Sequence, residues 1–366
     1  MHVSAISLTA PQNPSGGLKT LVGRCFMHPA IDYLLVGGGI TIPIFAAIYF
    51  FPVLTPAIDG PFDLKSFLLI NGAHFAASTV RLYTKKGAKE EFPFLSWGFP
   101  VICLIAVGLG LYWPLLGSNL TALYFTWSPY HYAAQTYGLA VMYAMRSGAK
   151  LDQRDKTQIW WVCLLPFLYA LLTSKDGGLS WFISPATIAA TPVLATVHSG
   201  LVALVTVGII ALPFSVFWQL HRMRGRKVPL ISLLLQITNG IWWLTTDYLS
   251  AWWWTAAFHS IQYLIIVVMI HVQEQMARTD VTHRWHNPLF YGGTFYGLSA
   301  VVAGILFFIV PLAYVPLGFG APQALVMMTV VINLHHFIVD GFIWRTKPAP
   351  RGPTTNTPQT AVPATA

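Results

Sequence analysis

The chain has 366 residues, of which 55% are hydrophobic and only 9% are charged. Soluble domains carry charge on roughly 25% of their residues, so this composition excludes an ordinary water-soluble globular protein. The net charge of +9 is not accompanied by any nucleic-acid-binding motif, so we expect membrane lipids, and no nucleic acid, as partners.

Apolar stretches of about 20 residues recur along the chain and predict an all-α fold, a polytopic transmembrane helix bundle of about ten spans. The predicted spans are residues 30–52, 65–84, 94–116, 119–145, 157–174, 189–220, 229–249, 252–275, 289–315 and 322–344. One transmembrane helical domain would fill residues 28–346. It follows a polar N-terminal segment, residues 1–27, and precedes a C-terminal tail, residues 347–366, whose composition predicts disorder.

The basic residues predict the orientation of the bundle. They cluster after the even-numbered predicted spans, at residues 81–89, 146–156, 222–227, 278–284 and 345–351. Cytoplasmic loops of membrane proteins carry the excess of Lys and Arg. We therefore expect both termini and all five clusters on the cytoplasmic side.

Histidines recur in the even-numbered predicted spans. Five of them lie about 7 to 14 residues from the outer end of their span, which at 1.5 Å per residue is roughly 10 to 21 Å: His74, His131, His198, His259 and His336. Titratable groups inside a membrane indicate function, and imidazole is the commonest metal ligand. The pattern predicts a buried metal site, although histidines that only pack or relay protons remain an alternative.

Polar residues lie three or four positions from four of these histidines, on the same helical face: Asn71, Gln135, Gln262 and Asp340. Metal-bound histidines usually donate their second ring nitrogen to such a group. We therefore expect Asp340 to act through His336. We also expect His74, His131, His259 and at least one of His198 and His336 to converge on one point.

Four short motifs resemble a known family. They are NGAHF at 71–75, YHYAAQ at 130–135, HSIQY at 259–263 and HHFIVDGFIWR at 335–345. They are similar in sequence and order to motifs of the bacterial Brp/Blh β-carotene 15,15′-dioxygenases, integral membrane enzymes that cleave a carotenoid to retinal with a histidine-bound non-haem iron. The resemblance implies an iron oxygenase in a bacterial inner (plasma) membrane.

The chain departs from that family at one position. Tyr263 stands where the family has a second histidine, four residues after the histidine of the HS pair. A complete iron site would then need His198 or His336 as a replacement ligand. The motifs cover well under a fifth of the chain and do not name the substrate.

The favoured function is a membrane-embedded, metal-dependent oxygenase that takes a lipid, isoprenoid or carotenoid from the bilayer. Iron is the expected metal, with copper or zinc as alternatives, because all three accept imidazole ligands. Tyr263 and Asp340 are the candidate catalytic residues, and no motif identifies an electron donor. The alternatives are a haem-binding electron carrier and a proton-coupled transporter with the histidines and Asp247 as its relay.

Overall fold

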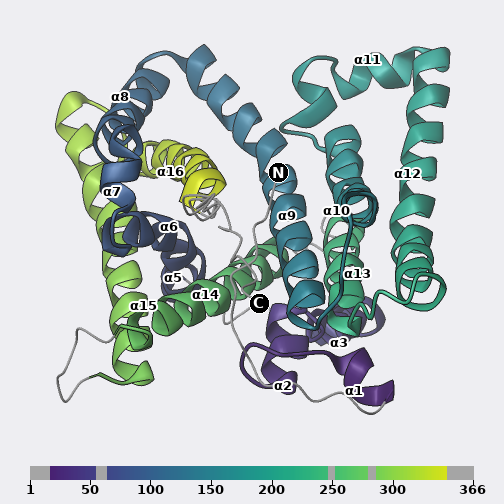
Figure 1. Ribbon diagram of the computed structural model, residues 1–366. Helices are drawn as coiled ribbons and strands as arrows, with labels where there is room; N and C mark the ends of the chain where they lie inside the picture. The colour runs from purple at the N-terminus through teal and green to yellow at the C-terminus, as the bar shows by residue number, and fades with distance from the viewer. Residues whose placement is uncertain (1–16, 55–63, 246–251, 279–285, 344–366) are drawn as a thin grey trace, which may run out of the picture.

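The structure is a computed structural model that describes residues 17–54, 64–245, 252–278 and 286–343 (Figure 1). All regular elements in these ranges are helices, which confirms the all-α fold class. Asp247, most of the predicted N-terminal segment and the whole predicted C-terminal tail lie outside the described residues.

The described α-helices follow one another along the chain as a series of long and short elements. They are α1 Gly17–Val22, α2 Pro29–Ile31, α3 Thr41–Phe50, α5 Leu64–Phe67, α6 Ala73–Thr84, α7 Ala88–Glu91, α8 Phe99–Tyr112, α9 Pro114–Arg146, α10 Gln153–Thr173, α11 Pro185–Ala190, α12 Pro192–Trp218, α13 Leu230–Thr245, α14 Trp252–Met276, α15 Pro288–Gly304 and α16 Ala321–Ile343. Several continue into π-helical turns, η1 Asp32–Val36, η3 Leu68–Gly72, η4 Phe94–Gly98, η6 Gln219–Met223 and η7 Ile305–Ile309. The 3₁₀ segments are η2 Pro52–Leu54, η5 Gly178–Trp181 and η8 Val310–Leu317.

Six of the described helical stretches are long and apolar enough to cross a membrane. They are Phe94–Tyr112, Gln153–Trp181, Pro192–Met223, Trp253–Met276, Pro288–Leu317 and Ala321–Ile343. The bent pair Pro29–Val36 and Thr41–Phe50, which meet at 49°, would make a seventh if it forms one span. An integral membrane protein built as a helical bundle is therefore supported, whereas the predicted count of ten spans is not.

The difference has a physical cause in the helices that face protein rather than lipid. Three of the predicted spans correspond to α5–α6, α9 and α13. Buried polar side chains interrupt their apolar character, for example Arg81 on α6, Thr136 on α9 and Gln236 on α13. Polar residues in a membrane domain face the interior of the bundle, and they lower the hydropathy of α5–α6 and α9. α13 is apolar but has only 16 described residues, which is too short to cross a membrane.

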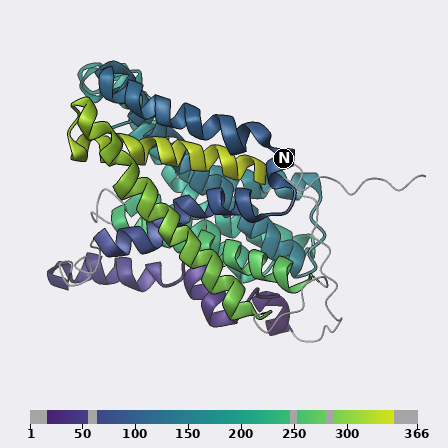
Figure 2. The ribbon, with the colours of Figure 1, turned by 90° about the vertical axis from the view of Figure 1, so that its left-hand side faces the viewer.

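The interior helices are surrounded by more exposed ones. α9 packs against α10, α13 and α16, while α6 packs against α15 and α16. In Figure 2, α15 runs obliquely across the near side of the bundle. α12 stands at the opposite edge in Figure 1, and its buried residues are only Ile209 and Pro213. An apolar helix exposed along nearly its whole length is suited to contact with lipid.

Ion pairs join two of the basic loops at one end of the bundle. Arg226, after α12, binds Asp152 at 2.6 Å and Asp155 at 2.8 Å, at the start of α10. Asp152 and Asp155 also form a reciprocal capping box on that helix. The loops around residues 146–156 and 222–227 therefore lie on the same side, as the alternation of basic clusters predicts.

Candidate metal centre

Four helices each bring one histidine to the centre of the bundle. His74 comes from α6, His131 from α9, His259 from α14 and His336 from α16, and all four are buried. The ring centroids of His74 and His336 are 4.4 Å apart, and those of His131 and His336 are 4.8 Å apart. The His259 ring lies 5.0 Å from His74 and 5.2 Å from His131. The structure thus gathers four imidazoles into one cluster.

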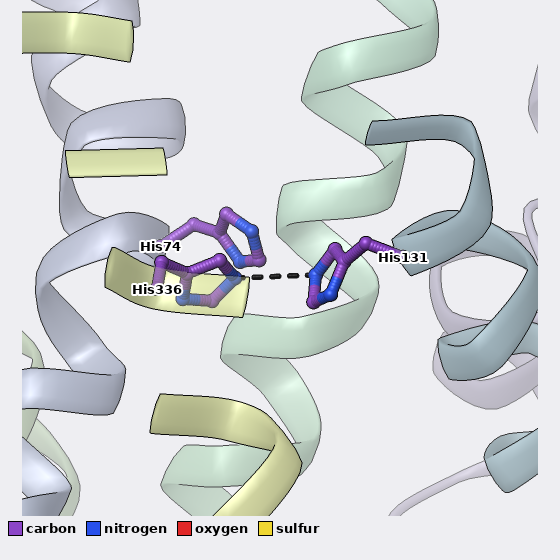
Figure 3. A group of neighbouring side chains, drawn as sticks. All are labelled: His74, His131 and His336. Atoms are coloured by element: carbon purple, nitrogen blue, oxygen red, sulfur yellow. Dashed lines mark hydrogen bonds between the residues drawn. The ribbon is translucent and has the colours of Figure 1, made fainter. Parts of the chain in front are cut away.

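Three of these rings could bind one ion. The imidazoles of His74, His131 and His336 point toward one another in Figure 3, and one nitrogen from each lies within 4.8 Å of the others. Nε2 of His336 is 3.2 Å from Nε2 of His131. Two ligands of one ion, each at about 2.0–2.2 Å, lie at most about 4.4 Å apart, so small side-chain rotations would complete the site.

Missing hydrogen bonds provide independent support for a ligand here. Neither ring nitrogen of His74 has a hydrogen-bond partner among the described residues, and the same holds for Nε2 of His259. Buried polar atoms nearly always have partners, and an unsatisfied one commonly marks a binding site for an ion or a water. A metal ion among the rings would bind one nitrogen of His74 and could bind Nε2 of His259.

His259 is held in place by an aromatic neighbour. Its ring stacks on Tyr132, with centroids 3.6 Å apart and planes inclined by 7°. It lies next to the group of three without belonging to the set whose nitrogens are mutually close. His259 is therefore placed to be a fourth ligand after a change of side-chain rotamer, or to border the site.

His198 is the one predicted ligand that the structure does not bring to the cluster. It lies on α12 at the edge of the bundle, and its Nε2 is 3.0 Å from the carbonyl oxygen of Leu172 on α10. An imidazole N–H that donates to that carbonyl ties two helices together. Of the two candidates for the remaining ligand, His336 is the one that faces the other histidines.

Each of the four histidines is followed, four positions later on its helix, by a polar residue. These residues are Ser78, Gln135, Tyr263 and Asp340, and together they form a polar layer one helical turn from the rings, here called the lower layer. Ser78 Oγ lies 3.0 Å from Nδ1 of His336, so Ser78 occupies the position that the sequence predicts for Asp340. The sequence analysis missed Ser78, although its spacing from His74 was a usable signal.

Asp340 contacts the other side of His336. Its Oδ2 lies 3.7 Å from Nε2, the nitrogen that faces His131, which is too far for a hydrogen bond. Oδ1 instead accepts a 2.6 Å hydrogen bond from the hydroxyl of Tyr263. Asp340 thus lies beside the nitrogen of His336 that faces His131 and is held there by Tyr263 of α14, while the expectation that it acts through His336 stays a prediction.

The three predicted amides bind neighbouring helices rather than imidazole rings. Nε2 of Gln135 donates to the backbone oxygen of His259 at 3.2 Å and to Oε1 of Gln262 at 3.3 Å. Oδ1 of Asn71 accepts a 2.8 Å hydrogen bond from Ser260. These bonds fix α14 against α9 and against η3, the turn that leads into α6, and they position the histidines through the backbone.

Comparisons with protein-family models, with curated proteins and with solved structures found no match to this chain. The resemblance to the Brp/Blh dioxygenases therefore stays a prediction that rests on the short histidine motifs.

Proposed function

We propose that the protein is a membrane-embedded non-haem iron oxygenase that acts on an apolar substrate taken from the bilayer. His74, His131 and His336 would hold the metal, with His259 beside them. The observation that carries the proposal is the pair of buried, unpartnered nitrogens of His74 inside a cluster of imidazoles. Polar atoms of this kind are costly to bury without a partner, and a metal ion would take up the one lone pair that a neutral ring offers.

The donor set bears on which cofactor would fit. Neutral imidazoles suit iron, copper or zinc, and iron combines this ligation with oxygen chemistry at open coordination positions. A haem would need a gap between two histidines wide enough for its macrocycle. Nε2 of His131 and Nε2 of His336 are only 3.2 Å apart, and two further imidazoles adjoin them, so the geometry favours a single ion over haem.

Asp340 and Tyr263 are placed to handle protons beside that ion. The Asp340 carboxylate lies on the side of His336 that faces His131, and Tyr263 donates to it. An iron ion would supply binding and activation of O₂. Asp340 would accept a proton from a group bound at the cluster, and Tyr263 would keep the carboxylate in position.

The finer topology belongs to the same proposal: ten spans, both termini in the cytoplasm, and a bacterial inner membrane as the location. Four predicted even-numbered spans support it, because α6, α9, α14 and α16 carry the histidines at one level of the bundle. The ion-paired loops at residues 146–156 and 222–227, which share one side, support it as well.

A proton relay is the competing function, and one observation favours it. The 3.2 Å approach of His131 and His336 is also the geometry of one imidazole donating to another, and Ser78 extends this chain of polar groups. Linked buried groups of this kind can pass protons through a membrane protein. A relay of this kind would function without a metal.

Metal analysis and an optical spectrum of the full chain, purified in detergent without chelators, would separate these functions. The oxygenase proposal expects about one iron per chain and no Soret band. A Soret band would refute the oxygenase proposal and support a haem-binding electron carrier. If the protein contains no metal and takes up none when iron(II) is supplied anaerobically, the proton relay is the function that remains.

A further inference from the structure

A cavity lies one helical turn from the histidine cluster. Each of the four histidine-bearing helices contributes to its wall the residue three positions before its histidine, and these residues form an upper layer of Asn71, Ser128, Ala256 and Asn333. Three residues of helix correspond to about 4.5 Å, so this layer is stacked directly on the rings. His259 itself lines the cavity, which therefore borders the candidate metal centre.

The size and walls of the cavity indicate what could enter it. Its volume is about 170 Å³. An engineered protein cavity of about 150 Å³ binds benzene, so this one admits a group the size of a six-membered ring. Aromatic side chains make up much of the wall, among them Phe75, Tyr132 and Phe337 near the histidines and Trp253 farther away. Trp253 is 50% exposed, so the lining reaches the surface of the bundle at the start of α14.

Three hydroxyl groups on this wall have no hydrogen-bond partner among the described residues. They belong to Tyr124, Ser128 and Tyr132, which follow one another at intervals of four along α9. Ser128 and Tyr132 are each 8% exposed. These hydroxyls face the cavity and can hydrogen-bond with water there, so a ligand that displaces the water is expected to bring oxygen atoms that replace those bonds.

We propose that the cavity binds an oxygen-substituted six-membered ring, a phenol or a quinone, carried on an apolar chain that lies in the bilayer. The inference deepens the proposed function. It rests on that function for one point, the reason why a ring would be bound next to a metal. The ring could belong to a quinone of the membrane, whose reduced quinol form would donate the electrons, or to an oxygenated substrate. Both share the chemistry that this wall recognises: a flat apolar ring with a hydroxyl or carbonyl group at its edge.

Equilibrium binding of three probes to the full chain in detergent tests the inference. The probes are decylbenzene, 4-decylphenol and decyl-1,4-benzoquinone, which share one chain length and differ in ring oxygens. We expect an oxygenated probe to bind about tenfold more tightly than decylbenzene, because each hydrogen bond to a buried hydroxyl adds affinity. Tyr132→Phe and Ser128→Ala should each reduce that ratio severalfold.

Two further variants control for structure. Thr329→Val also changes a hydroxyl on the cavity wall, but that hydroxyl donates to the Leu325 carbonyl of its own helix, so the ratio should not change. Ala256→Leu adds carbon atoms within the upper layer and should weaken binding of all three probes by at least tenfold. Its iron content should match the wild type, which shows that the fold and the histidines are intact.

The outcomes are distinct. Preferential binding of the benzoquinone identifies a membrane quinone as the ligand, and preferential binding of the phenol identifies an oxygenated substrate. Equal binding of decylbenzene and both oxygenated probes, or a preference that survives Tyr132→Phe and Ser128→Ala, would overturn the inference.

The titrations are repeated on protein stripped of metal. Ring preference without any iron-binding capacity would refute the oxygenase alone, whereas iron binding without ring preference would refute the cavity alone.

Discussion

The hydroxyl of Tyr263 donates a 2.6 Å hydrogen bond to Oδ1 of Asp340, and this bond joins α14 to α16 beside the histidine cluster. Both side chains are buried. The Tyr263 ring also meets the His74 imidazole edge-on, with centroids 4.6 Å apart. The pair therefore connects three of the four helices that carry the histidines, and its loss should disturb both stability and the site.

A double-mutant cycle tests whether this bond couples the two residues. Tyr263→Phe removes one donor from a buried carboxylate and should lower the free energy of unfolding by about 1–3 kcal/mol. Asp340→Asn should cost a similar amount, and the double variant little more than either change alone. Unfolding in detergent measures all three. Losses that add fully would show that Tyr263 and Asp340 are independent.

Ser78 is expected to support the metal through His336. The Ser78 hydroxyl lies 3.0 Å from Nδ1 of that ring, and loss of such a partner typically weakens metal binding by 10- to 100-fold. Ser78→Ala should therefore lower iron affinity within this range, as measured by competition with a chelator. Ser260→Ala is the matched control, since that buried serine binds Asn71 and no imidazole. Equal effects of the two changes would contradict the role of Ser78.

The ion pairs between the loops predict a dependence on pH. A hydrogen bond from the Asp155 backbone N–H, followed by the charge of Arg226, lowers the pKa of Asp152 below its usual value of 3.8. A carboxyl group with a lowered pKa stabilises the fold at higher pH, and this contribution is lost as the pH falls through the folded pKa. Because the group is exposed, the effect is small.

Asp152→Asn tests this dependence while retaining a good helix cap. The variant should melt slightly below the wild type at pH 6, and the gap should close as the pH is lowered below 3.8. Melting temperatures of both proteins across this range provide the measurement. A gap of the same size at every pH would show that the charge of Asp152 makes no contribution.

The sequence predicted well what a single helix determines. Similar depth in alternate spans was enough to place His74, His131, His259 and His336 at one level, because depth follows from position along a helix. It could not separate His336 from His198, since both lie at suitable depths. The two differ because α12, which carries His198, stands at the edge of the bundle. The position of α12 is determined by how the helices pack.

The polar partners show the same limit more clearly. Spacing along the chain pairs residues of one helix, such as His336 with Asp340. The hydrogen bonds in the structure run between helices: Ser78 with His336, and Tyr263 with Asp340. Such contacts depend on how each helix is rotated about its axis, which a single sequence does not specify. The predicted count of ten spans exceeds the six described stretches that qualify, because buried polar residues lower the hydropathy of interior helices such as α9, and α13 is apolar but short.

The iron content of two histidine variants, compared with the wild type, tests the central claim most directly. His74→Ala removes a ring from the cluster, and His198→Ala removes a ring that binds the Leu172 carbonyl instead. After anaerobic loading with iron(II) and desalting, the wild type and His198→Ala should each retain about one iron per chain, and folded His74→Ala little or none. Equal retention by both variants, or loss of iron from His198→Ala alone, would contradict a metal centre built from His74, His131 and His336.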